Sequence, residues 1–265
     1  RLFLINCLYN SPGGDNRLFV YNGITYIASG FTGPNANAIR NVSSHKKRIY
    51  ITENGTSAIW YGAVNGVTGA MTSFDALSLF TKGGYVSGVV SISRETPAGD
   101  KSQLAIFSNL GEVLIYDGDF PGSADWILVR RLEIAPLIEY SGLWDGWTQV
   151  GSDVFVLTTA GIVSLQAALG GSSLDDLIKV NGHVRDNTGL HNSALLSADV
   201  PHDSIAYFAA KNKVIVTYPS GSNFNQVVID TKTYQSTLWT DIPCSHLAQS
   251  RSKLYGIGKN ANNNV

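Results

Sequence analysis

Apolar residues at every second position recur along this chain, and each such run is closed by a turn. Alternation with period two places successive side chains on opposite faces of an extended strand, so it predicts β-strands. The clearest runs begin at Arg17, Arg48, Leu104, Asp153, Lys213 and Lys253. This pattern restricts the chain to folds built almost wholly from antiparallel strands.

Short linkers containing Gly or Asn join pairs of these runs. Both residues accept the positive φ of tight turns, so the linkers predict β-hairpins. They lie at 21–24, 53–56, 109–112 and 159–162. A helix start is indicated only at 172–178, where a Ser cap precedes Asp175 and Asp176 in the first turn.

An all-β chain of 265 residues can close a barrel, stack sheets as a sandwich or repeat them radially. The runs start roughly 30 to 60 residues apart, which suits four-stranded blades. We therefore predict an all-β, β-propeller-like fold of about five or six divergent blades, with a tandem β-sandwich as the alternative. No low-complexity linker divides residues 1–265, so we expect one domain. The chain opens without Met, and we expect it to be a fragment of a longer chain.

The charge balance excludes some classes of partner. The chain has 19 basic and 20 acidic residues, and a net charge of -1 recruits nucleic acid only through a local patch. No apolar stretch reaches the length of a membrane span, and no signal peptide is recognisable. Only 15% of residues are charged, which suits a subunit largely covered by neighbours. We expect Cys7 and Cys244 to be free thiols.

The stretch SNLGEVLIYDGDF at 108–120 raises the question of a carboxylate site. Glu112 follows a hairpin turn, so we expect it to face solvent. Asp117, Asp119 and Asp125 fail the EF-hand pattern, because Pro121 takes its fifth position. These acids predict a turn and a strand edge.

Other chemical signals are weak. The five histidines have neither a triad context nor metal-ligand spacing, and no Ser lies in a G-x-S-x-G motif. The GIGKNA stretch from Gly256 lacks the helix that a dinucleotide site needs, and HKKR at 45–48 predicts a solvated turn, with a phosphate or nucleic-acid contact as the alternative. The histidines are His45, His183, His191, His202 and His246.

The aromatic pair Trp144 and Trp147, with Asp145 between them, is typical of sugar binding, although indoles near strand starts more often belong to a core. With Asp117, these residues are the candidates for a carbohydrate-binding or glycan-cleaving propeller. We assign no catalytic, cofactor-binding or metal-binding residue, and we expect a non-enzymatic protein.

Several segments between roughly residues 40 and 258 follow one another in a particular order. They are an Arg-led strand ending in Trp-Tyr, a Phe-Asp-Leu region with Gly-Gly, a Ser-x-x-Gly-Glu-Val-x-x-Tyr-x-Gly hairpin, a Leu-Thr-x-x-Gly strand pair and a terminal Trp with its return strand; an Ala, Ala76, interrupts the Phe-Asp-Leu run. The residues concerned are Arg48, Trp60, Tyr61, Phe74, Asp75, Gly83, Gly84, Ser108, Gly111, Glu112, Val113, Tyr116, Gly118, Leu157, Thr158, Gly161, Trp239 and 253–257. This order resembles tail-hub and head-completion proteins of short-tailed bacteriophages, which include the packaged-DNA stabilisation proteins.

The resemblance implies a structural part of the virion, located in its neck or tail. Such a part would form a homo-oligomeric ring below the portal or adaptor ring, close the channel after packaging, and connect the head to the tail tip or spikes. It implies no cofactor and no active site, and it leaves open whether a loop contacts packaged DNA.

Overall fold

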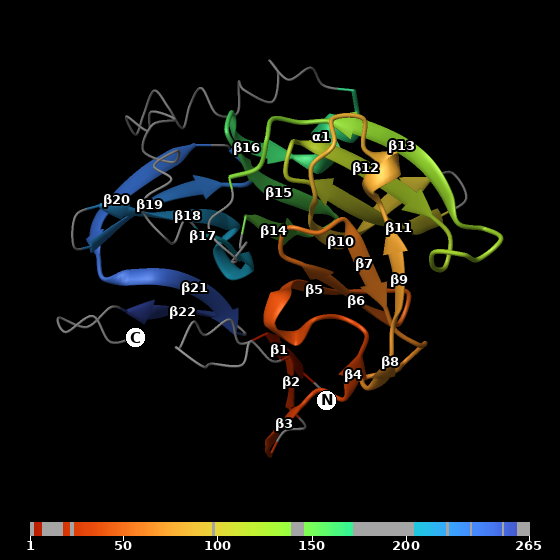
Figure 1. Cartoon of the computed structure of the whole chain (residues 1–265). Helices are drawn as coiled ribbons and strands as arrows, with labels where there is room; N and C mark the ends of the chain where they lie inside the picture. Colours follow the sequence, from red (N-terminus) through yellow and green to blue (C-terminus); the bar gives the residue numbers. More distant parts are fainter. Residues whose placement is uncertain are drawn as a thin grey trace. The chain divides into compact units, whose positions relative to one another are not determined.

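The computed structural model describes residues 3–6, 18–21, 24–96, 99–138, 146–171, 204–220, 223–233, 235–250 and 252–258. Within these ranges the regular structure is almost entirely β-strand (Figure 1). The part of the chain that the structure describes contains no helix long and apolar enough to span a membrane.

The chain divides into two compact units, Arg1–Glu133 with Gly142–Trp144 and Ile134–Ser141 with Asp145–Val265. The single domain over 1–265 stays a prediction. The elements of the first unit are β1 (Phe3–Asn6), β2 (Leu18–Tyr21), β3 (Tyr26–Ala28), β4 (Phe31–Thr32), η1 (Ala36–Ala38), β5 (Ile39–His45), β6 (Arg48–Glu53), β7 (Ala58–Tyr61), β8 (Gly69–Ala70), β9 (Thr72–Asp75), η2 (Leu77–Leu79), β10 (Val86–Thr96), β11 (Gly99–Ser108), β12 (Glu112–Asp117) and β13 (Ile127–Glu133).

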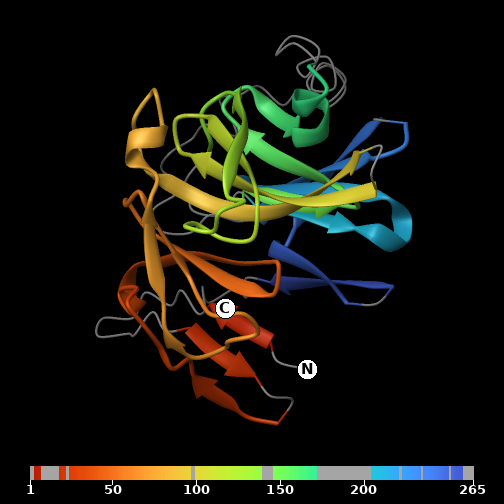
Figure 2. The same cartoon turned by 90° about the vertical axis from the view of Figure 1, so that its right-hand side faces the viewer.

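Two four-stranded antiparallel sheets form the centre of the first unit, with strand orders β5-β6-β7-β9 and β10-β11-β12-β13. Each sheet keeps its strands in chain order, which is the meander order of a blade (Figure 2), although the short β8 lies between β7 and β9 in the sequence. A three-stranded sheet, β1-β2-β3, and a short parallel pair, β4-β8, complete the unit.

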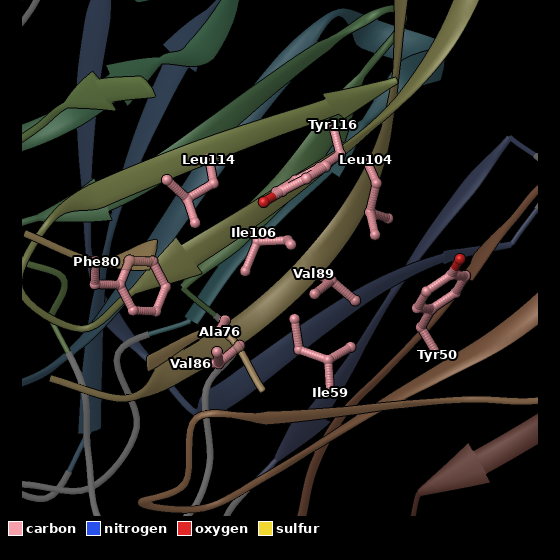
Figure 3. Close-up of a cluster of buried hydrophobic side chains, with 10 residues drawn as sticks. All are labelled: Tyr50, Ile59, Ala76, Phe80, Val86, Val89, Leu104, Ile106, Leu114 and Tyr116. Carbon is pink, nitrogen blue, oxygen red and sulfur yellow. The ribbon is translucent and has the colours of Figure 1, made fainter. Parts of the chain in front are cut away.

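The core of the first unit lies between these two sheets. Apolar side chains of β10, β11 and β12 point toward those of β6 and β7 (Figure 3). Val89, Leu104, Ile106 and Leu114 are fully buried there. All of β12 from Glu112 to Tyr116 is buried, so this strand is covered on both faces.

The second unit repeats the same kind of sheet. Its strands form the orders β14-β15-β16, β17-β18-β19-β20 and β21-β22. A core of side chains including Phe155, Val216 and Val227 joins the first two sheets. The elements are β14 (Trp147–Val150), β15 (Asp153–Thr158), β16 (Gly161–Ser164), α1 (Leu165–Leu169), β17 (Ser204–Phe208), η3 (Ala209–Lys211), β18 (Lys213–Ser220), β19 (Asn223–Asp230), β20 (Ser236–Ile242), β21 (Cys244–Ser250) and β22 (Lys253–Gly258).

The hairpins predicted at 53–56, 109–112 and 159–162 are confirmed as the turns of β6-β7, β11-β12 and β15-β16. β2 and β3 pair on either side of 21–24, where residues 22 and 23 lie outside the described ranges. The helix predicted at 172–178 also lies outside them. The short helix α1, capped by the Ser164 hydroxyl, was not predicted.

Candidate functional site

Glu112 does not face solvent as the sequence predicted. Its side chain is 0% exposed and its carboxylate is enclosed by four donors. Oε1 accepts from the Thr81 amide at 3.0 Å, the Thr81 hydroxyl at 2.6 Å and the Arg131 guanidinium at 3.4 Å, while Oε2 accepts from the Lys82 amide at 2.6 Å. The prediction of a solvated hairpin residue is wrong, because β12 is an inner strand whose two faces are both covered.

The environment of Glu112 favours its ionised form. Burial alone would raise the pKa of this carboxyl, but the donors from Thr81 and Lys82 and the charge of Arg131 lower it below its ordinary value. A carboxylate that accepts from this many fixed donors holds no proton to donate and has no unoccupied oxygen facing solvent. Glu112 is therefore an anchor between a loop and a strand.

The loop at 80–85, which contains Gly83 and Gly84, binds Glu112 through Thr81 and Lys82. The β11-β12 turn also holds this loop. The Tyr85 amide donates to Asn109 Oδ1 at 2.9 Å, and the Ser108 hydroxyl donates to the Gly83 carbonyl at 3.3 Å. Gly84 has φ +89, and a Cβ there would lie 2.2 Å from Asn109 Oδ1. The Gly-Gly and Ser-x-x-Gly-Glu segments of the phage resemblance are thus one packed structure.

The acidic turn after β12 is neutralised by lysines. Lys101 Nζ lies 3.0 Å from Asp117 Oδ2, and Lys46 Nζ lies 3.2 Å from Asp119 Oδ1. The hydrogen bond from Lys101 is the main reason that the pKa of Asp117 lies below its ordinary value. The carboxylates of the stretch 108–120 therefore divide into a buried anchor, Glu112, and two acids in ion pairs at the strand edge, Asp117 and Asp119.

Asp125 closes the same turn from within. Its Oδ1 accepts from the Ser123 hydroxyl at 2.5 Å, and this bond lowers the pKa of Asp125. Gly118 has φ +111, and a Cβ at this position would meet the Asp125 carbonyl oxygen at 2.4 Å. Among the described residues, no three His, Cys, Asp or Glu side chains are grouped as a metal site requires.

The basic cluster at 45–48 forms the β5-β6 turn, as predicted. Lys46 and Lys47 have φ values of 43 and 63, the conformation of a two-residue hairpin. Arg48 stacks over the Phe120 ring at 4.1 Å, and the Tyr61 hydroxyl donates to the Pro121 carbonyl at 2.8 Å. The cluster is joined to the acidic turn, so its solvation is only partial.

His45 is the one buried histidine among the described residues. Its ring is 1% exposed, and Nδ1 lies 2.9 Å from the Ser91 hydroxyl, which in turn lies 3.1 Å from the Ser102 hydroxyl. Burial, followed by the nearby charge of Lys46, lowers the pKa of His45 to about 4. The imidazole is therefore neutral at pH 7 and joins β5 to β10.

Of the carbohydrate candidates, Trp147 and Asp117 lie within the described ranges. Trp144 and Asp145 lie outside the described ranges, and Trp147 is half-buried in β14. Asp117 is held by Lys101. Of the remaining histidines, His183, His191 and His202 also lie outside the described ranges.

The features that sequence reasoning missed are exposed apolar side chains on edge strands. On β13, three consecutive residues, Ile127, Leu128 and Val129, are 58%, 39% and 42% exposed. On β20, Trp239 is 45% exposed. Both strands are outermost in their sheets. The apolar residues are visible in the sequence as the run WILVRR at 126–131, but periodicity cannot tell an edge strand from a central one.

No family model matches the sequence, and no curated protein matches it. The structure of YCF48 bound to D1 peptide is similar, with a TM-score of 0.51 and 9% identity over 90% of this chain and 67% of that chain. BBS1N in complex with ARL6DN gives a TM-score of 0.48 and 10% identity, covering 93% and 69%. AztD of Citrobacter koseri gives 0.41 and 14%, covering 83% and 51%.

This chain thus spans between about half and about two thirds of these proteins. At such identities the likeness concerns the fold alone. The four-stranded meander sheets and the likeness to YCF48 show that the chain has an all-β, β-propeller fold, as the sequence predicted.

Proposed function

We propose that this protein is a non-enzymatic assembly subunit of a phage virion, located at the neck or tail hub. It forms a homo-oligomer below the portal or adaptor ring, helps to close the channel after packaging, and connects the head to the tail tip or spikes. The observation that carries this proposal is the row of consecutive exposed apolar residues on the edge strand β13.

Exposed apolar residues in a row on a strand edge favour contact with another chain. An unpaired edge presents backbone donors and acceptors as well as its side chains, and monomeric proteins usually protect it. β13 carries Ile127, Leu128 and Val129 at such an edge. A subunit that is covered in an assembly is expected to have this surface, whereas a sugar site would place polar groups beside the exposed rings.

The residues behind the phage resemblance support a scaffold role. Glu112, Gly84 and Ser108 hold one loop against one hairpin, and Tyr116 stacks on Trp126 with ring centroids 4.6 Å apart. These contacts stabilise the packing of the sheet and its loops. The similar structure of YCF48 has a bound peptide, and a polypeptide partner suits this proposal better than a small substrate.

Binding to a virion ring tests the proposal. The purified chain is immobilised and exposed to portal and adaptor rings of short-tailed phages, with the capsid protein as a negative control. We expect retention of a portal or adaptor ring, with complexes visible by negative-stain electron microscopy.

Two results would contradict the proposal. One is the failure of all rings to bind at micromolar concentration. The other is saturable binding to a glycan array that is lost when Trp239 is replaced by Ser, because it would move the protein to the carbohydrate-binding class.

A further inference from the structure

Two Asn-Gly pairs lie in turns that the structure describes. An Asn followed by Gly is the dipeptide that most readily loses its side-chain amide, because glycine has no Cβ to hinder the main-chain nitrogen that attacks it. The described pairs are at 54–55, in the β6-β7 turn, and at 65–66, between β7 and β8, and both asparagines are exposed. The sequence has further pairs at 22–23 and 181–182, which lie outside the described ranges.

The attacking nitrogen has different surroundings in the two turns. The Gly66 amide donates to the Ala63 carbonyl at 3.1 Å, and a Cβ on Gly66 would lie 3.2 Å from the same oxygen. The Gly55 amide donates no hydrogen bond to the part of the chain that the structure describes. Gly55 has φ +69, and a Cβ there would meet nothing within 4 Å. The nitrogen of Gly55 can therefore approach a neighbouring side chain, whereas that of Gly66 is already bound.

The side-chain amide of Asn54 is held by a buried cation. Arg40, on β5, is 4% exposed, and its Cζ lies 5.5 Å from the centroid of the Tyr85 ring. Its Nη1 donates to Asn54 Oδ1 at 3.1 Å. Negative charge develops on this oxygen when Asn54 Cγ is attacked. A charged donor already aimed at the oxygen stabilises that charge.

We propose that Asn54 is a modification site of this protein, which converts to Asp through a cyclic succinimide with the help of Arg40. In the first step the Gly55 nitrogen attacks Asn54 Cγ. The bond between this nitrogen and Cγ forms, the Cγ–Nδ2 bond breaks, and Nδ2 leaves as ammonia with the proton of the Gly55 amide. In the second step one water molecule opens the ring. The reaction thus consumes water and releases ammonia, and it does not depend on the assembly role proposed above.

Arg40 also influences which product forms. Water that attacks Cγ breaks its bond to the Gly55 nitrogen and restores the normal main chain, with Asp at position 54. Water that attacks the main-chain carbonyl carbon leaves the chain running through Cγ, as isoaspartate. Arg40 polarises the Cγ carbonyl, so it favours Asp, whose carboxylate then forms an ion pair with the guanidinium. Each folded copy thereby gains one negative charge at this turn as it ages.

Ageing of the folded chain at about pH 8, followed by peptide mapping with mass spectrometry, tests the proposal. Heavy-oxygen water labels each new carboxylate and separates conversion during ageing from earlier conversion. Asn65 is the matched internal control. We expect Asn54 to convert about fivefold faster than Asn65, because the Gly66 amide must first lose its hydrogen bond. In the urea-denatured chain the two rates should be similar, and the share of Asp at position 54 should be smaller.

Three variants separate the roles of the nitrogen and the cation. Gly55→Ala places a Cβ beside the attacking nitrogen and should slow conversion of Asn54. Arg40→Gln removes the charged donor and should slow it about tenfold, while the rate at Asn65 stays unchanged. Arg40→Lys keeps the charge and should restore part of the rate. Circular dichroism verifies folding. If Arg40→Gln does not fold, the comparison of the two asparagines and the product ratio in wild type decide the question.

Three results would overturn the proposal. One is a folded chain in which Asn54 converts no faster than Asn65, after each rate is divided by its value in urea. Another is a share of Asp at position 54 that is no larger in the folded chain than in urea. The third is a folded Arg40→Gln variant that converts Asn54 at the wild-type rate, because it would show that the cation takes no part.

Discussion

At the residue scale, burial and charge pairing decide the roles of the ionisable side chains. Glu112 and His45 are both almost completely buried, and each connects two segments of the first unit. The carboxylate is held ionised by donors, and the imidazole is held neutral by burial. Asp117 and Asp119 lie in the adjoining turn and are matched by lysines. A carboxylate thus serves as an anchor where the fold buries it and as an edge charge where it stays near solvent.

Replacing Glu112 by Ala should strongly destabilise the protein. The change leaves two backbone amides, the Thr81 hydroxyl and the partly exposed Arg131 guanidinium without the acceptor that Glu112 supplies, at a cost of about 2 to 4 kcal/mol of the free energy of unfolding. Urea denaturation at pH 7 measures it. Glu133→Ala, which removes an exposed partner of Lys82, is the control and should cost less than about 1 kcal/mol. Equal losses would contradict the anchor role.

The neutral His45 predicts loss of stability on acidification. Its pKa is 6.5 when unfolded and about 4 when folded, so the unfolded chain binds the proton first. Stability from this group is complete well above pH 6.5 and decreases as pH falls toward 4, by about 3 kcal/mol.

Urea denaturation at pH 7, 5.5 and 4.5 tests this dependence. His45→Gln, which keeps a polar group near Ser91, should flatten the profile between pH 6.5 and 4.5. An unchanged slope in the variant would show that other groups control it, with Lys46, Asp117 and Asp119 as the charges that face the ring.

At the element scale, the sheets are meanders whose turns depend on a few glycines. The β11-β12 turn and the loop at 80–85 are held together by Glu112, Asn109 and Ser108. Gly84 lies at the closest approach of the two segments. Gly84 is favoured for two separate reasons, its positive φ and the lack of space for a Cβ.

Gly84→Ala should destabilise the protein more than Gly83→Ala. Both glycines have positive φ, so both changes strain the backbone, but only at residue 84 would the Cβ meet Asn109 Oδ1 at 2.2 Å. We expect about 1 to 2 kcal/mol for Gly83→Ala and at least 1 kcal/mol more for Gly84→Ala. Thermal denaturation of the two variants in parallel measures the difference, and equal effects would refute the close contact.

At the scale of the whole molecule, sheets of one type recur in both compact units. Repeated sheets bury both faces of their inner strands, which explains why β12 and the middle of β19 read as nearly continuous apolar runs. The outer strands lack this cover on one side. Exposed apolar residues lie on β13 and β20, the outermost strands of their sheets.

We expect the chain to unfold in one cooperative transition, because the sequence predicts a single domain. Differential scanning calorimetry at pH 7 should give one peak whose calorimetric and van't Hoff enthalpies agree. Glu112→Ala should then shift the entire transition. Two resolved peaks, with only one shifted by this substitution, would show that the two compact units unfold independently.

The sequence by itself determined the strand content and most hairpins, because period-two alternation and turn residues such as Gly55, Gly111 and Gly161 act within a few residues. It also placed the basic turn at 45–48. The number of blades stays a prediction.

Only the tertiary structure decided which face of a strand meets another sheet. It buried Glu112, brought Lys46 to Asp119 and left Ile127 to Val129 uncovered. The contacting partners are 73 residues apart in the case of Lys46 and Asp119 (119 minus 46) and 30 or 31 apart for Glu112 and its loop. Local sequence patterns cannot predict whether a residue is buried by segments this far away in the sequence. Its burial depends on which strands come to lie beside one another in the fold.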